Sequence, residues 1–262
     1  GRGRWSSALY AGIGLGIALS GAVVPVLDCF GGWSTAWLGM GVLSALLALA
    51  GISVAGKRQS AIFVPDVPET ARGSLSGIVR LSSAYFLEGF GYIVSATFLV
   101  TMIAHTPGLA GFAPWSWVAV GLAAAPSTIL WQQAAIRLGV RQALTLAYML
   151  QAGGILLSIN AANPLQAGLA AALFGGTFLG IVALVMAEGG RRCGTEGRRA
   201  TAVLTVCFGA GQVMGPPLAG LLADRQGGFT LSLLLAAGVV AIGGVLVATD
   251  SRFSAVSASD KT

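Results

Sequence analysis

Residues 209–229 read GAGQVMGPPLAGLLADRQGGF, and the first glycines are spaced like a variant of the loop that binds dinucleotide phosphates. That loop requires a preceding β-strand and an acidic residue about 20 positions further on. Here the preceding residues, RRATAVLTVCF at 198–208, are a basic cluster that leads into an apolar run. Gly211 and Gly215 lie four residues apart on one helical face, a spacing typical of closely packed membrane helices. The stretch therefore predicts a membrane helix bent at Pro216 and Pro217, and no nucleotide site.

The composition places the whole chain in a membrane. Hydrophobic residues make up 55% of the 262 residues and charged residues 9%, against about 25% charged in a typical soluble domain. Apolar stretches of about 20 residues recur, which is the length needed to cross a bilayer. The basic residues lie in short loops between these stretches, so they do not indicate a nucleic-acid partner. One His and three Cys predict neither a metal site nor a disulfide framework, and no cofactor is expected.

Charged residues and Gly, Pro or Asn residues divide the chain into eight predicted spans, which makes it an all-α polytopic membrane protein. The predicted spans are 8–27, 33–55, 80–105, 113–133, 141–160, 164–188, 199–222 and 229–249. Every Lys and Arg except Arg225 falls on one side of this arrangement. Because basic loops stay in the cytoplasm, both termini are expected there.

The turn after Gly215 has a copy far upstream. Asp224-x-x-Gly-Gly-Phe follows Asp28-x-x-Gly-Gly-Trp by 196 residues, and Gly209-x-Gly211 matches Gly12-x-Gly14 with a slip of one residue. Six spans separate the copies, which predicts two parallel six-helix halves related by an axis along the membrane normal. On this interpretation four helices precede Gly1, and the N-terminal half is incomplete. The alternative is a complete eight-helix protein whose outer turns coincide.

A bundle of six and six helices with a long cytoplasmic loop between them resembles the major facilitator superfamily (MFS) of secondary transporters. IRLGVRQAL at 136–144 resembles the superfamily's cytoplasmic motif Gly-x-x-x-Asp-Arg-x-Gly-Arg-Arg/Lys, although Ile136 replaces the Asp, Gln132 the first Gly and Val140 a basic residue. GQVMGPPLAG at 211–220 resembles the Gly-Pro motif of antiporters, whereas its upstream counterpart GIALSGAVVP lacks the Gly-Pro pair. Antiport is therefore not implied. The helix-packing and gating positions that these motifs predict are Gly12, Gly16, Gly21, Pro25, Gly211, Gly215, Pro216, Gly220, Arg137, Gly139 and Arg141.

Three longer stretches resemble the bacterial YbfB-type branch of the superfamily, namely YFLEGFGYIVSATFLV, GTFLGIVALVMAEG and RRATAVLTVCFGAGQVMGPPLAGLLAD. The resemblance covers essentially the whole chain, as helices five to twelve of such a protein. It implies a multi-pass transporter of the bacterial cytoplasmic (inner) membrane that acts on a small-molecule substrate. It divides the chain into the last two helices of an N-terminal bundle (1–55), a central loop (56–79), a six-helix C-terminal bundle (80–250) and a cytoplasmic tail (251–262). A monomer is compatible with this organisation.

Glu88 is the only acidic residue clearly inside a span, about 6 Å from its midpoint at 1.5 Å per residue. An ionised carboxylate at that depth costs several kcal/mol, so the group is expected to be neutral, paired or in a wet cavity. Tyr85, Tyr92 and Ser95 follow the same helical face and predict a polar stripe around it. We interpret this stripe as a proton-coupling or substrate site. The alternative is a protonated, structural Glu88 that is hydrogen-bonded to a neighbouring helix.

Gln151 and Gln212 lie near the centres of their spans and are candidate substrate contacts or, equally, interhelical hydrogen-bond partners. Glu188 is expected in an inner-surface cluster with Arg191, Arg192, Arg198 and Arg199, which would suit a gate latch. Proton-coupled symport is the favoured function and proton-driven efflux its close alternative. A non-transporting receptor or scaffold is the alternative of another class, and the residues needed for a membrane enzyme are too few.

Overall fold

The computed structural model describes residues 2–55 and 75–253, and it is built from helices alone over these residues. The α-helices are α1 (Arg2–Ala55), α2 (Val79–His105), α3 (Ala113–Leu138), α4 (Val140–Ile159), α5 (Pro164–Cys193), α6 (Gly197–Gln226) and α7 (Thr230–Ala248). Short 3₁₀ turns occur at η1 (Leu75–Ile78), η2 (Ala110–Phe112) and η3 (Ser251–Phe253). The predicted all-α class is therefore confirmed. Most of the predicted loop at 56–79 and of the predicted tail at 251–262 lies outside the described residues.

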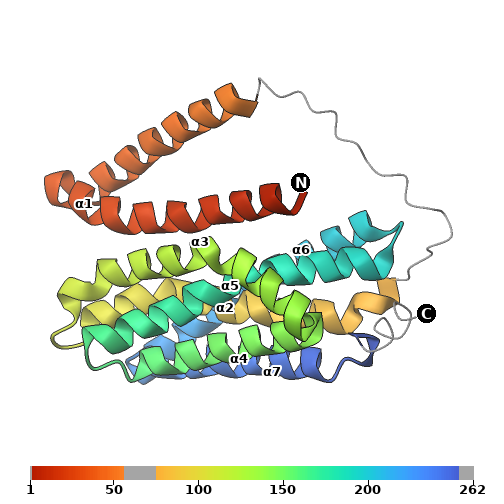
Figure 1. Ribbon diagram of the computed structural model, residues 1–262. Coiled ribbons are helices and arrows are strands. Elements are labelled where there is room, and N and C mark those ends of the chain that lie inside the picture. Colours follow the sequence, from red (N-terminus) through yellow and green to blue (C-terminus); the bar gives the residue numbers. More distant parts are fainter. Residues whose placement is uncertain (1, 56–74, 254–262) are drawn as a thin grey trace.

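Helix α1 folds back on itself and supplies two arms (Figure 1). The helical backbone is interrupted at Gly31 and Gly32, and Gly32 has φ 69° and ψ −166°, a region that is essentially restricted to glycine. With its 54 residues, α1 is more than twice as long as the roughly 20 residues that one crossing needs. Its two arms match the first two predicted spans, and α2–α7 match the other six. Seven helices of the described chain, with α1 counted once, are long and apolar enough to cross a membrane.

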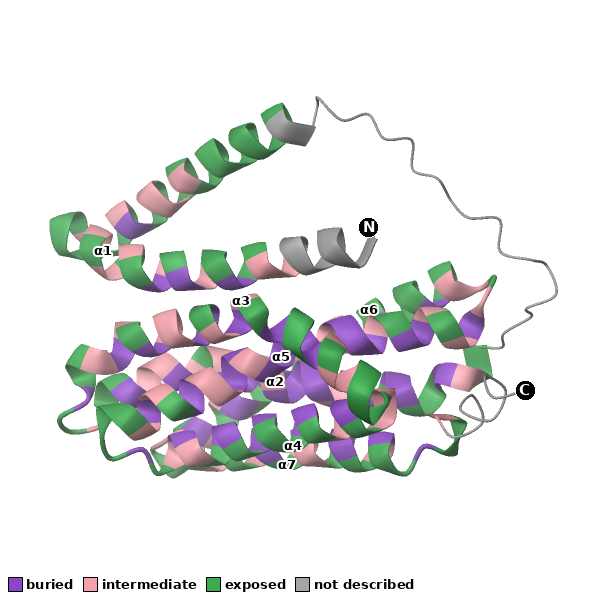
Figure 2. Ribbon diagram, in the orientation of Figure 1, coloured by how far each residue is buried: buried purple, intermediate pink, exposed green. Residues whose placement is uncertain are grey.

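Helices α2–α7 pack around one continuous buried core, and the first arm of α1 lies against α3 (Figure 1). A Cβ atom added at Gly14 would overlap the backbone of Ala125, and one added at Gly121 would overlap the backbone of Ala18. The second arm instead exposes most of its large apolar side chains, among them Trp37 at 75% (Figure 2). Of the two arms in the first predicted domain, the first therefore packs against the bundle, and the second leaves most of its large apolar side chains exposed.

Glycines set the distances between helices inside the bundle. Gly211 of α6 touches the backbone of Phe86 and Phe90 in α2, and Gly89 of α2 touches the backbone of Phe208 in α6. Between α3 and α5, an added Cβ atom at Gly175 would overlap the backbone of Val120. Without side chains at these positions, two backbones can approach closely and gain van der Waals contact.

Gly139 is the single residue that joins α3 to α4. Its φ of 88° and ψ of 150° lie where residues with a Cβ atom are strained. The chain can therefore reverse direction at this single residue. Gly139 is also the glycine that matches the cytoplasmic MFS motif in the sequence.

Candidate functional site

Glu88 lies on α2 and is fully buried, with 0% of its surface exposed. Its carboxyl oxygen Oε1 accepts a hydrogen bond of 2.7 Å from the side-chain amide Nε2 of Gln151 on α4. Gln151 is also fully buried. Two of the residues selected from the sequence are therefore brought into direct contact, because α2 and α4 both pack against α7.

The polar contacts continue from α4 to α5. Thr177 lies on α5, and its hydroxyl Oγ1 is 3.2 Å from the amide oxygen Oε1 of Gln151. The same hydroxyl is 2.8 Å from the carbonyl oxygen of Leu173 one turn earlier. Glu88, Gln151 and Thr177 thus form a chain of three buried side chains from three helices, which we call the polar chain. Sequence reasoning missed Thr177, although a hydroxyl within the apolar stretch GGTFLG is a visible signal.

The second carboxyl oxygen of Glu88, Oε2, has no hydrogen-bond partner among the described residues. No ion pair with a basic side chain is formed by Glu88 within the same residues. A lone charge in such surroundings costs several kcal/mol. In this conformation the carboxyl group is therefore suited to its neutral form, and a proton can be released only when the surroundings of Glu88 change.

The polar stripe on α2 stays a prediction, and in the structure the two tyrosines that flank Glu88 pack as aromatic rings. Tyr85 stacks on Phe208 of α6 with ring centroids 4.5 Å apart, and Tyr92 stacks on Phe178 of α5 at 4.9 Å. Ser95 donates to the carbonyl oxygen of Gly91 in its own helix at 2.8 Å. Within the described chain, no hydrogen bond joins Tyr85, Tyr92 or Ser95 to Glu88. A helical wheel places these residues on one face but cannot show that neighbouring helices present phenylalanines to that face.

Another tyrosine, not selected from the sequence, lies on the α4 side of Glu88. Tyr148 is fully buried and donates from its hydroxyl to the carbonyl oxygen of Ala84 on α2 at 3.2 Å. It precedes Gln151 by three residues, and this spacing could have placed both on the same helical face. Gln212 is half-buried on α6. No hydrogen bond in the described part of the chain links Gln212 to the polar chain.

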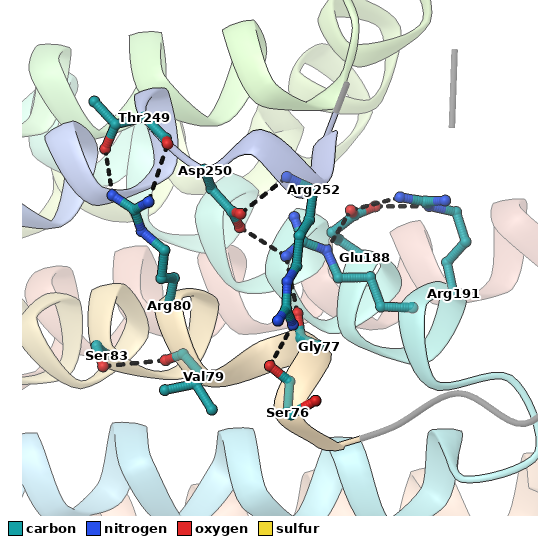
Figure 3. Close-up of polar contacts among 11 residues, drawn as sticks. Ser76, Gly77, Val79, Arg80, Ser83, Glu188, Arg191, Thr249, Asp250 and Arg252 are labelled. Carbon is teal, nitrogen blue, oxygen red and sulfur yellow. Dashed lines mark hydrogen bonds and ion pairs between the residues drawn. The ribbon is translucent and has the colours of Figure 1, made fainter. Parts of the chain in front are cut away.

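A second cluster lies at the C-terminal ends of α5 and α7, which we call the inner ends because they are predicted to face the cytoplasm (Figure 3). Glu188 is 2% exposed and accepts hydrogen bonds from Nε of Arg191 at 2.8 Å and from Nε of Arg192 at 2.7 Å. Arg192 also reaches Asp250 at 2.7 Å through Nη1 and lies over the ring of Phe253. This inner-end network therefore places one arginine between two buried carboxylates.

The η1 turn joins the inner-end network through main-chain oxygens, and α2 contacts the end of α7 through Arg80. Arg192 donates to the carbonyl oxygen of Gly77 at 3.2 Å, and Arg80 donates to Thr249 Oγ1 at 2.6 Å (Figure 3). Arg252 donates to the carbonyl oxygen of Ser76. All these residues belong to η1, α2, α5, α7 or η3, so the network fastens helices of the six-helix bundle to one another.

The predicted membership of this inner cluster needs correction. Arg191 and Arg192 do surround Glu188, but Arg199 pairs with Glu196 at 3.1 Å and its side chain is 74% exposed. Arg198 is exposed and forms no ion pair within the described residues. The reason is geometric, because α5 ends at Cys193 and α6 starts again at Gly197, which turns the second arginine pair away. Asp250 was missed, although an acidic residue at a basic helix end is unusual.

The other motif residues separate into packed and open positions. Gly215 packs against Ile93 and Val94 of α2, and Gly21 packs against Val118 of α3. At Gly12, Gly16 and Gly220 an added Cβ atom would meet nothing within 4 Å among the described residues, so within this part of the chain these glycines make no close packing contact. The reason is helical register, since Gly14, Ala18 and Gly21 form the face turned to α3. Pro25 and Pro216 lie inside α1 and α6, Arg137 is exposed and Arg141 is half-buried.

A cavity of about 530 Å³ lies between the inner half of α2 and α6. Its lining is mostly apolar and includes Ser82, Phe86, Val203 and Cys207. Phe86 and Glu88 are two residues apart, so they point in roughly opposite directions from the axis of α2. The cavity and the polar chain therefore lie on different sides of the same helix.

The sequence of the chain was compared with known proteins and protein families. A search of the curated proteins found no match. The family model described as "Uncharacterised MFS-type transporter YbfB" matches residues 1–248, which is nearly the whole chain. The match agrees with the seven helices of the described chain that are long and apolar enough to cross a membrane. The chain belongs to the YbfB-type family of MFS transporters.

Proposed function

We propose that the protein moves a small organic solute across the bacterial cytoplasmic membrane by alternating access, and that protons drive this movement in symport. Membership of a transporter family supports a small-molecule substrate and a bilayer environment. The single observation that carries proton coupling is Glu88, a fully buried carboxyl group whose Oε2 has no partner among the described residues. Such a group can bind and release a proton at the cost of only a local change in solvation.

The proposal is tested with Glu88→Gln, which keeps the shape of the side chain and removes the titrating proton. Cells that express wild-type protein or the variant are given a complex metabolite mixture, and depletion of each metabolite is followed by mass spectrometry with and without a protonophore. We expect wild-type cells to take up at least one solute in a protonophore-sensitive manner, and E88Q cells to lose that uptake while exchange of the solute persists.

The matched control is Glu196→Gln, the same change in a surface ion pair at the inner end of α6. E196Q should transport as the wild type does. Protonophore-sensitive uptake that is unchanged in E88Q would overturn proton coupling through Glu88. Binding of a solute without exchange in any variant would instead support a receptor.

Proton-driven efflux of an apolar solute is the second candidate, and the mostly apolar cavity between α2 and α6 favours it. Because that cavity lies on the inner half of the bundle, next to η1, an apolar compound could enter it from the cytoplasmic side. The two candidates differ in direction. In wild-type cells a symporter raises the internal solute concentration when the proton gradient is restored, whereas an efflux pump lowers it.

The orientation belongs to the proposal as well. The excess of basic residues in the loops on one side supports cytoplasmic N- and C-termini. Reporter fusions placed at the Gly31–Gly32 turn and at Gly139 should report opposite sides of the membrane, with Gly139 in the cytoplasm. The reverse assignment would contradict the orientation.

A further inference from the structure

The Thr177 hydroxyl has more acceptors within reach than it has protons to donate. Its Oγ1 lies 3.2 Å from the amide oxygen of Gln151, 2.8 Å from the carbonyl oxygen of Leu173 and 3.0 Å from that of Phe174. A hydroxyl group has one proton and can also accept. Thr177 can therefore either donate to Gln151 or donate to its own helix and accept from Gln151.

Gln151 can match either choice, because its amide group has a donor end and an acceptor end of nearly the same shape. When the amide NH₂ faces Glu88, it donates to Oε1 at 2.7 Å, and the amide oxygen accepts from Thr177. An ionised carboxylate can only accept hydrogen bonds, so it requires this direction, although its Oε2 has no partner among the described residues.

The opposite direction satisfies a protonated Glu88. One proton is then added to the carboxylate, and the new O–H donates to the amide oxygen of Gln151. The side-chain amide of Gln151 is then rotated by 180°, so its NH₂ donates to Thr177 Oγ1. The Thr177 hydroxyl turns and donates to the carbonyl oxygen of Leu173. No other atom is gained or lost, and each of the two contacts, Glu88–Gln151 and Gln151–Thr177, keeps one donor and one acceptor.

We propose that Gln151 and Thr177 are positioning residues that reverse the direction of the polar chain whenever Glu88 binds or releases a proton. The inference rests on the proposed proton coupling and adds how the proton's arrival on α2 is communicated to α5. A threonine that donates to the carbonyl four residues earlier bends its helix. Thr177 does so next to Gly175, where α5 touches the backbone of Val120 in α3.

The other groups around Glu88 do not compete for its proton. The titratable side chains of the described chain that interact electrostatically with Glu88 are Tyr85 and Tyr92 on α2 and Tyr148 on α4, and Tyr10 on α1 interacts with Tyr85. All are neutral phenols at physiological pH. Residues of α5, α6 and α7 that contact Tyr92, Gly91 or Gln151 include Phe174, Thr177, Phe178, Phe208, Ala236 and Val240, none of which titrates.

The test needs no substrate, because the hydrogen-bond direction can be followed by infrared difference spectroscopy. Purified protein in lipid, with ¹³C in its glutamine side-chain amides, is taken through a pH step. In the wild type we expect the carboxylic acid band of Glu88 to appear together with a shift of one glutamine carbonyl band. Both changes should be absent from E88Q, and the glutamine shift should be absent from Gln151→Leu.

Thr177→Val and Thr177→Ser separate the role of the hydroxyl from that of packing. Valine has the size of threonine without the hydroxyl, so T177V should keep the Glu88 band but lose most of the glutamine shift and proton-driven uptake. T177S retains a hydroxyl and should behave as the wild type. If the Glu88 band titrates while the glutamine band stays constant in the wild type, the inference is wrong and the proposed coupling stands. If Glu88 gives no titrating band, both are wrong.

Discussion

Arg192 shows how much a single side chain can stabilise at the inner end of the bundle. Its side chain is 6% exposed and bonds to Glu188, which is 1% exposed, and to Asp250, which is 2% exposed. The guanidinium carbon Cζ lies over the ring of Phe253, 4.1 Å from its centre. Removal of such a buried charge leaves its partners without compensation, which costs more than the pair itself contributes.

Arg192→Met is therefore expected to destabilise the protein by about 3–5 kcal/mol, read as a large fall in the melting temperature of the detergent-solubilised protein. Arg199→Met removes an arginine that is 74% exposed from a surface pair, and such pairs contribute about 0–1 kcal/mol. Equal melting temperatures for the two variants would contradict the account of the inner-end network.

Gly139 allows a second prediction about a single residue. Glycine is required here by the backbone conformation and not by a side-chain contact. Its φ of 88° and ψ of 150° cost a residue with a Cβ atom about 1–3 kcal/mol. Gly139→Ala should lower the melting temperature. Gly153→Ala is the control, since Gly153 lies inside α4 with open space around an added Cβ atom, and alanine favours a helix interior by about 0.5–1 kcal/mol. A stabilising Gly139→Ala would show that the one-residue turn is not strained.

Among elements, the contact of α6 with α2 depends on Gly211 and Gly215. A Cβ atom at Gly211 would overlap the backbone of Phe86, which cannot move out of the way as a flexible side chain can. Gly211→Leu should therefore separate the helices, at a cost of about 1–3 kcal/mol or more, and reduce the yield of folded protein.

Gly220→Leu on the same helix is the matched control, because an added Cβ atom there meets nothing within 4 Å. Its melting temperature and yield should stay close to those of the wild type. If both leucine variants lose stability to the same degree, the cause is the helix sequence and not the contact with α2.

At the same scale, the positions of the helices followed from the sequence almost completely. Apolar spans and their charged or glycine-rich boundaries predicted α2, α3, α4 and α7 to within about five residues, because hydrophobic length is set by the bilayer. The inner ends of α5 and α6 extend beyond the predicted spans, to Cys193 and from Gly197. Arginines there were taken to mark the membrane boundary, but a helix can continue into the aqueous layer when its charges are paired.

Across the whole molecule, the sequence predicted the acidic residue of the candidate site but not the side chains that contact it. Glu88 was identified because an acidic residue in a span is rare and costly. Its contact with Gln151, 63 residues away, depends on how α2 and α4 are rotated about their axes. Hydropathy gives the length of a span but carries little information on that rotation when glycine and alanine occupy every face. The stacking of Tyr92 could not be predicted for the same reason, since the phenylalanines facing it belong to α5 and α6.

The whole-molecule account rests on proton movement through Glu88. The most direct test uses proteoliposomes that contain the protein and a pH indicator in the outer solution. A solute from the metabolite screen is then added outside. Wild-type protein should make the outer solution more alkaline as solute enters, and E88Q should exchange labelled solute without any change in outer pH. Alkalinisation by E88Q at the wild-type rate would contradict the assignment of Glu88 as the proton-coupling residue.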